Sequence, residues 1–241
     1  MYLLLDANVV AGYYLPRSLQ SRKARERARI IIDSVRSGAT NHFLYIANFC
    51  VAEVFSVFAK YAFGTWNRHV KKAGGTIDKR VYLSLRTQFA KDIHNGALFY
   101  HYELSRYHVL GIDLVAPIDH YFQISRGKGR NHKPAGTFDH LLISMGIHLA
   151  HIHGAENVCL VSTDDRLTNI LSRCRNGVSA KTIKRLKLNV AEQVTGKPFS
   201  GAIFPRFLNL KSATHTELCS VFGVWPLPIK AHTAAYRWSK A

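Results

Sequence analysis

Two short, uniformly apolar runs, each leading into an aspartate, constrain the fold of this chain most strongly. Residues 3–5 are three leucines that run straight into Asp6, and residues 158–161 run into the turn Ser162-Thr163-Asp164. Continuous apolar runs of this length are typical of parallel strands that are covered on both faces. Helical patterns separate the two runs along the chain. The sequence therefore predicts an α/β fold in which helices flank a parallel sheet.

The remaining elements follow from periodicity and capping signals. A third strand is expected at about 43–46, and Asn48 is expected to cap the apolar helix that follows it. Thr137 or a neighbouring residue is expected to cap a later helix, up to about residue 153. The other expected helices cover about 18–36, 78–94 and the stretch from the Asp164 turn to about 173.

Composition places the chain among globular proteins. It has 241 residues, of which 47% are hydrophobic and 20% charged, which fits one α/β domain with additions. The first five residues are too short for a signal peptide, and no apolar run reaches the roughly 18 residues that a membrane span needs. The four cysteines lack zinc-ligand spacing, so we expect free thiols in a reducing cytoplasm.

The strongest global signal is charge. The chain carries 33 Lys and Arg against 15 Asp and Glu, a formal net charge of +18. Such an excess attracts polyanions, and aromatic residues accompany the basic ones in several stretches, which favours nucleic acid as the partner. The alternatives are an acidic partner protein or a cationic surface that serves solubility alone.

In so basic a chain, the few acids stand at conspicuous positions. Asp6 and Asp164 follow strands, Glu53 lies within an apolar helix, and Asp139 opens another helix. An isolated buried carboxylate costs several kcal/mol or becomes neutral. Convergence on a hard divalent cation removes that cost, because Mg²⁺ and Mn²⁺ prefer oxygen ligands. The carboxyl ends of parallel strands are also where α/β proteins place their sites.

Each acid also has a structural interpretation. Asp139 can serve the first turn of its helix, and Asp164 can cap the next one. Glu53 can lie on the polar edge of its helix. Asp6 is the hardest to explain in this way, since aspartate is depleted in strands.

Taken in order, these motifs resemble the PIN-domain family of ribonucleases. The matching segments are Leu4-Leu5-Asp6-Ala7-Asn8, Glu53 in an apolar helix, Asp139 at a helix start, and Val161-Ser162-Thr163-Asp164 after a strand. The resemblance implies a PIN-like fold and a metal-dependent endoribonuclease that hydrolyses RNA. It implies Asp6, Glu53, Asp139 and Asp164 as ligands of Mg²⁺ or Mn²⁺, with Asn8 and Ser162 in support. Asp165 is an additional ligand or the true fourth one.

The resemblance covers residues 2–174 with a large interruption. We expect a nuclease domain at 1–175, a helical insertion at about 64–136, and a basic C-terminal extension at 176–241. The basic loop before Asp139 is expected to hold the RNA backbone, although a solvated loop is the alternative. Its basic residues are Arg126, Lys128, Arg130 and Lys133.

Several functional alternatives remain open at this point. One is a catalytically silent, PIN-like module that binds RNA, and another is a structure-specific DNA nuclease. A third is the toxin of a toxin–antitoxin pair, with a small acidic protein as its partner. The sequence leaves the oligomeric state open, a dimer included. It also does not separate RNA from DNA, because recognition of the 2′-hydroxyl leaves no short motif.

Overall fold

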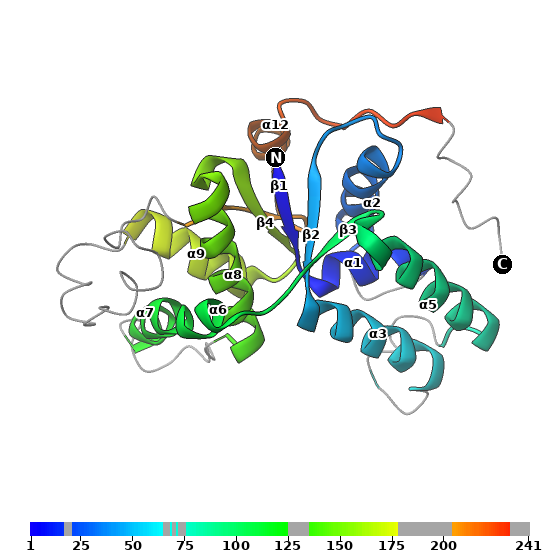
Figure 1. The fold of residues 1–241 in the computed structure, drawn as a ribbon, viewed down its shortest axis with the longest axis horizontal. Helices are drawn as coiled ribbons and strands as arrows, with labels where there is room; N and C mark the ends of the chain where they lie inside the picture. Colours follow the sequence, from blue (N-terminus) through cyan, green and yellow to red (C-terminus); the bar gives the residue numbers. More distant parts are fainter. Residues whose placement is uncertain are drawn as a thin grey trace. The chain divides into compact units, whose positions relative to one another are not determined.

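A computed structural model describes residues 1–16, 21–64, 68, 71, 76–124, 135–177 and 204–231. The chain has an α/β fold with a five-stranded sheet in the order β3-β2-β1-β4-β5 (Figure 1). It divides into two compact units. Unit 1 comprises residues 1–102, 161–163 and 209–241, and unit 2 comprises residues 103–160 and 164–208. The predicted α/β class with a parallel sheet and flanking helices is confirmed.

The strands are β1 (Tyr2–Leu5), β2 (Phe43–Ala47), β3 (Phe99–Tyr102), β4 (Val158–Ser162) and β5 (Arg206–Asn209). The α-helices are α1 (Ala7–Tyr14), α2 (Arg22–Arg36), α3 (Asn48–Phe63), α5 (Lys79–Ile93), α6 (Arg106–Leu110), α7 (Ile112–Ile124), α8 (Thr137–His153), α9 (Asp165–Gly177) and α12 (His215–Phe222). Short 3₁₀ turns cover His94–Gly96 and Ala155–Asn157.

In unit 1, β1, β2 and β3 are parallel neighbours. Leu3 of β1 pairs with Leu44 of β2, which pairs in turn with Phe99 of β3. Because side chains alternate along a strand, these three residues share one face of the sheet. All three are almost fully buried, and the ring of Phe99 packs against Tyr14 of α1 and Phe89 of α5. Helices of unit 1 therefore cover this face.

Most predicted elements of unit 1 form close to the expected bounds. The strand expected at 43–46 is β2, and Asp78 caps α5 by accepting a hydrogen bond from the Arg80 N–H. Asn48 differs from its predicted role. It is the first residue of α3, its side chain accepts from the Phe49 N–H, and Ala47 holds the cap position. The helix therefore starts one residue earlier than predicted, directly after β2 ends at Ala47.

Two strands lie where the sequence predicted other features. The edge strand β3 falls within the stretch expected to be a helical insertion, and β5 falls within the expected C-terminal extension. Both have only four residues, too few for their alternation to stand out from the surrounding helical patterns. The predicted boundaries at 64, 136 and 175 stay predictions.

Unit 2 is mainly helical and has its own buried polar contacts. The ring of His140 in α8 lies 3.0 Å from a carboxylate oxygen of Asp119 in α7, and that oxygen also accepts from the Ala135 N–H. The hydroxyl of Ser144 donates to the carbonyl of His108 in α6 at 2.6 Å. These contacts fasten α6 and α7 to α8, because each satisfies a polar group buried from water.

The described C-terminal residues from 209 onward pack in unit 1. Arg27 of α2 donates to the carbonyl of Leu210 at 2.9 Å, and α12 begins at a capping box formed by Thr214 and Glu217. No disulfide joins the four cysteines, all of which lie in the part of the chain that the structure describes. Among the residues that the structure describes, no helix combines the length and apolar character that crossing a membrane requires.

Candidate carboxylate site

Asp6 lies at the point where β1 ends and α1 begins. Its backbone N–H donates to the carbonyl of Val161 at 3.0 Å, which holds the end of β1 beside the end of β4. Its own carbonyl accepts from the N–H groups of Val9 and Val10, so Asp6 occupies the position before the first turn of α1. Only 8% of Asp6 is exposed. The strand thus delivers a buried carboxylate to the carboxyl edge of the sheet.

Two neutral donors orient this carboxylate. The hydroxyl of Ser162, which is fully buried, donates to Oδ2 of Asp6 at 2.6 Å. The amide of Asn8 lies 3.4 Å from the same oxygen. Both residues were predicted as supporting groups, and the structure places both against Asp6. Hydrogen bonds of this kind fix the direction in which a carboxylate presents its other lone pairs.

Glu53 and Cys50 approach Asp6 from α3. The two residues are three positions apart, so they lie on the same side of that helix. Asp6, Cys50 and Glu53 each present one ligand atom, and these three atoms lie within 4.8 Å of one another. The expected meeting of Asp6 and Glu53 is therefore present in unit 1. The sequence analysis missed Cys50, for which the helical spacing to Glu53 was the available signal.

Unit 2 carries the other two predicted acids. Asp139, in the first turn of α8, accepts from the Gly136 N–H at 2.9 Å. Asp164 precedes α9 and accepts from the Arg166 N–H at 2.7 Å, and it also pairs with the Arg166 guanidinium at 3.5 Å. Both acids thus fill the helix-start roles that were their structural alternatives.

Electrostatics links Asp139 to Asp164. Burial raises the pKa of Asp139 above its ordinary value, and the negative charge of Asp164 adds to that rise. The Gly136 N–H and the charge of Arg166 lower this pKa, but they do not cancel the rise. A nearby cation would stabilise the ionised form of Asp139 and lower this pKa.

The remaining predicted site residues fall into two groups. Asp165 is exposed in the first turn of α9, on unit 2. The basic residues of the loop before α8 lie outside the residues that the structure describes, namely Arg126, Lys128, Arg130 and Lys133. The structure therefore brings Asp6 and Glu53 together within unit 1, and Asp139 and Asp164 belong to unit 2.

The donors around Asp6 fit a divalent cation in part. Carboxylate oxygens from Asp6 and Glu53 suit Mg²⁺ or Mn²⁺, whereas a thiol suits softer metals such as Zn²⁺. The cost of placing two acids beside each other in a largely buried setting gives the cluster a reason to hold a cation. Cys50 is the member that departs from an all-oxygen set.

Comparison with known proteins adds no family to this description. No protein-family model matches the chain, and no curated protein matches it at a significant level.

Proposed function

We propose that this protein is a metal-dependent ribonuclease that hydrolyses the phosphodiester bonds of RNA. The observation that carries the proposal is the convergence of Asp6 and Glu53, whose ligand atoms lie within 4.8 Å of each other at the carboxyl ends of β1 and β2. Two acids so close together, one of them buried, are stabilised most simply by a divalent cation. The net charge of +18 supports a polyanionic substrate.

Each residue then has a role. Asp6 and Glu53 hold Mg²⁺ or Mn²⁺, and Ser162 and Asn8 orient Asp6. The proposal assigns Asp139 and Asp164 as further ligands, because the PIN-like resemblance implies them. A bound divalent ion lowers the pKa of a water molecule and stabilises the charge that develops on the phosphate. The protein supplies position and orientation, and no covalent nucleophile is required.

Cleavage of labelled single-stranded RNA and DNA, with Mg²⁺ or Mn²⁺, tests the chemistry directly. Wild type is compared with Asp6→Asn and Glu53→Gln, and Asp33→Asn is the matched control. Asp33 accepts a hydrogen bond from Tyr13 in unit 1 but is not part of the cluster. We expect metal-dependent cleavage of RNA that both cluster variants lose and the control retains. Cleavage that survives in Asp6→Asn would refute the carboxylate site.

A measurement without substrate separates metal binding from catalysis. Titration of the RNA-free protein with Mn²⁺, followed by electron paramagnetic resonance, reports binding alone. We expect Asp6→Asn and Asp139→Asn each to weaken Mn²⁺ binding if the acids of both units act on one ion. Binding that depends on Asp6 and not on Asp139 would restrict the site to unit 1. RNA binding without metal binding or cleavage would favour the silent module, and preferential cleavage of DNA would favour the DNA nuclease.

A further inference from the structure

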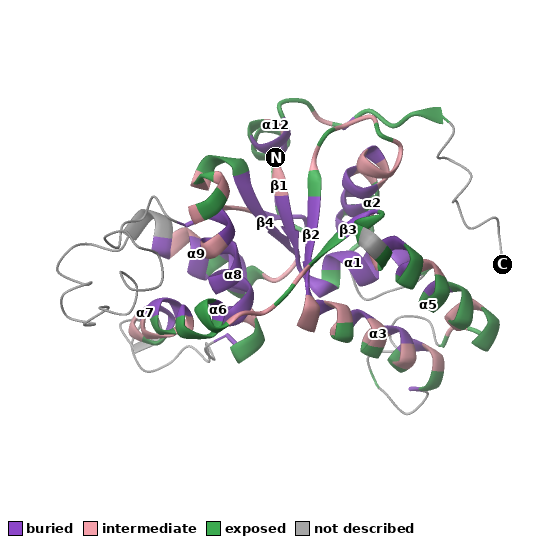
Figure 2. Ribbon diagram, in the orientation of Figure 1, coloured by how far each residue is buried: buried purple, intermediate pink, exposed green. Residues whose placement is uncertain are grey.

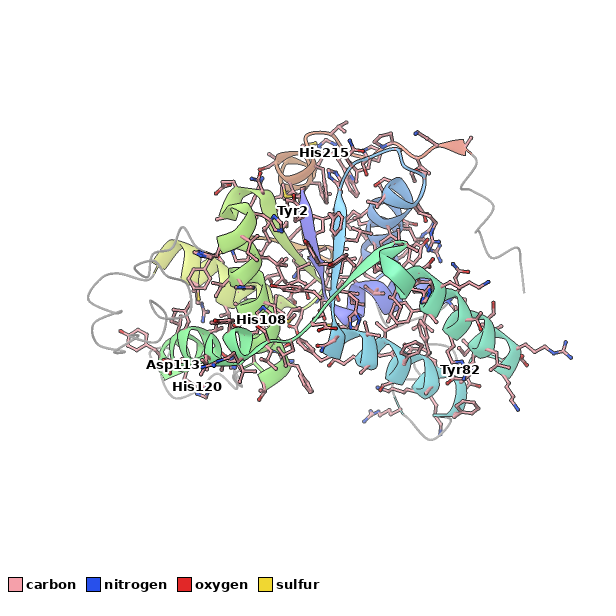
Figure 3. The ribbon with its side chains drawn as sticks, in the orientation of Figure 1. Tyr2, Tyr82, His108, Asp113, His120 and His215 are labelled. Carbon is pink, nitrogen blue, oxygen red and sulfur yellow. The ribbon has the colours of Figure 1, made fainter. Side chains whose placement is uncertain are left out.

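The second face of the unit 1 sheet carries a row of aromatic rings. The register pairs Tyr2 with Phe43 and Tyr45 with Tyr100, and it places Tyr102 beside Ala47. By alternation, these aromatic side chains point away from the face that the unit 1 helices cover. We call this set, formed by Tyr2, Phe43, Tyr45, Tyr100 and Tyr102, the aromatic face. Figure 3 labels Tyr2 beside β1.

The rings form one connected cluster. Tyr45 stands at its centre, with its ring centroid 5.4 Å from that of Tyr100 and 5.5 Å from that of Tyr102. Phe43 lies 5.1 Å from Tyr45, 5.5 Å from Tyr100 and 6.1 Å from Tyr2. Such distances are those of packed aromatic pairs.

The outer rings of the cluster remain open to solvent. Phe43 is 42% exposed and Tyr100 is 49% exposed, whereas Tyr45 is almost completely buried. Figure 2 shows that much of the edge strand β3 is exposed, whereas β1 is mostly buried. Exposed rings held by a rigid neighbour are costly in water and are typical of a binding surface.

A pocket opens at the amino ends of β2 and β3, between these strands and residues of α2 and α5. Phe43 and Tyr100 line it together with Arg36 and His42, and its volume is about 400 Å³. Nε2 of His42 is buried and has no hydrogen-bond partner among the described residues. A buried polar atom without a partner calls for a ligand or a water molecule that satisfies it. The lining also includes Asp92, whose carboxylate already pairs with the Arg36 guanidinium, so the rings of Phe43 and Tyr100 are the groups that offer the pocket a stacking surface.

We propose that the aromatic face stacks the unpaired bases of single-stranded RNA, and that the pocket beside His42 receives one base or nucleotide. Aromatic rings on a sheet can stack on the order of two or three bases, and such stacking requires bases that are not paired. The charge of the chain complements the phosphates of the same ligand. The inference rests on the proposed function for the identity of the nucleic acid.

The position of the aromatic face relates it to the carboxylate site of unit 1. The rings extend from Tyr2 and Phe43, at the amino ends of the strands, to Tyr102 near their carboxyl ends. Asp6 follows β1 at the carboxyl end, and α3, which carries Glu53, follows β2 there. An RNA strand whose bases stack along the aromatic face therefore runs toward Asp6 and Glu53. The substrate that this proposal implies is unpaired RNA, not an RNA duplex.

The test is a binding measurement without divalent metal. Fluorescence anisotropy of a labelled uridine 12-mer in EDTA is compared for wild type, Phe43→Leu and Tyr100→Leu. We expect each loss of a ring to weaken binding about tenfold, since stacking on one aromatic side chain is worth about 1–3 kcal/mol per base. Two controls accompany them. Tyr100→Phe keeps the ring and should bind like wild type, and Phe63→Leu removes a ring that is 57% exposed at the end of α3, away from the face.

Further readouts keep the inference separate from the proposed function. The same measurement in the Asp6→Asn background should give the same dependence on the rings, whether or not that variant cleaves. A duplex of matched length should show no dependence on Phe43 or Tyr100. In the cleaving enzyme, the ring variants should raise KM and leave kcat nearly unchanged. Photocrosslinking of 5-iodouridine RNA should label Tyr100 or Phe43.

Defined outcomes would overturn the inference. Equal affinity of Tyr100→Leu, Phe43→Leu and wild type would do so, as would equal weakening by Phe63→Leu. A dimer that dissociates when the rings are removed, measured by analytical ultracentrifugation, would show that a second copy covers the face. Circular dichroism melts of all variants establish that each remains folded.

Discussion

The surroundings of Asp6 and Asp92 differ, although both aspartates are buried in unit 1. Asp92 receives both terminal nitrogens of Arg36, at 3.0 and 2.5 Å, together with the hydroxyl of Tyr14 and the amide of Gln88. Asp6 receives the hydroxyl of Ser162 and the amide of Asn8, and it faces Glu53 and Cys50. The guanidinium of Arg36 neutralises Asp92, whereas Asp6 lies beside a second acid, Glu53.

This difference separates a structural carboxylate from a candidate ligand. Burial lowers the pKa of Arg36, but the hydrogen bonds and charge of Asp92 outweigh it and raise that pKa above its ordinary value. The guanidinium of Arg36 is therefore held against Asp92, and this contact joins α2 to α5. The carboxylates of Asp6 and Glu53 repel each other, and a divalent cation relieves this repulsion. Four experiments test the contrast.

The largest expected effect is on stability, at Asp92. Replacement by Ala leaves the guanidinium of Arg36, only 14% exposed at its side chain, without its buried partner. Loss of one partner of a buried ion pair costs about 3–5 kcal/mol in the free energy of unfolding. Urea denaturation measures the change, and Asp113→Ala, an exposed acid in α7, is the control. A loss of stability no larger than that of the control would contradict the structural role of Asp92.

The next effect is on activity, at Asp6. Substitution of Asp6 by Asn preserves the shape of the side chain and removes its charge. We expect the cleavage rate to fall more than about a hundredfold, which exceeds the loss typical of a residue that only hydrogen-bonds to a metal ligand. We also expect unfolding in the absence of metal to be little changed, since the repulsion with Glu53 is removed. Initial cleavage rates and thermal melts in EDTA measure the two quantities. A variant that unfolds like Asp92→Ala would instead make Asp6 structural.

An intermediate effect, on metal affinity, is expected for Ser162→Ala. Without its hydroxyl, Oδ2 of Asp6 loses its shortest described hydrogen bond, and we expect Mn²⁺ affinity to fall about tenfold. The control is Ser144→Ala, because Ser144 is also a buried serine but donates to the carbonyl of His108 in unit 2. That control should lower stability without changing Mn²⁺ affinity. Isothermal titration calorimetry discriminates the two variants, and equal affinity losses would contradict the assignment.

The smallest effect is a pH dependence at Asp139. Its folded-state pKa is raised, chiefly by burial, so the folded protein retains a proton that the unfolded chain has released. Stability from this group is therefore present below the ordinary pKa of aspartate and is lost as the pH rises through the raised value.

Asp139→Asn should remove that loss. Compared with wild type in EDTA, the variant should melt at a higher temperature at neutral pH, by less than about 4 °C, which corresponds to roughly 1 kcal/mol for a chain of this size. The difference should vanish toward about pH 3, where aspartate is protonated in both states. Differential scanning calorimetry across this range provides the check. A variant less stable than wild type at neutral pH would reverse the predicted sign.

Much of the fold followed from local patterns in the sequence. The apolar runs at 3–5 and 158–161 predicted β1 and β4, and helical periodicity placed α5, α8 and α9 close to their observed bounds. The acids at the strand ends were conspicuous for the same reason, because an aspartate after a buried strand is locally costly. Side-chain alternation and helical repeat act over a few residues, so a single sequence contains them.

The resemblance implied that Ser162 supports Asp6, but the tertiary structure decided which other groups meet. Asp92 accepts hydrogen bonds from Arg36 and Tyr14, which are 56 and 78 positions away in the chain. Ser162 donates one to Asp6, from which it is separated by 156 positions. The aromatic face depends on the register of three strands that are separated in the chain, and Cys50 joins the cluster through its contact with Asp6 of another element. Contacts over such separations are selected by the packing of the whole core. No local pattern in the sequence records them.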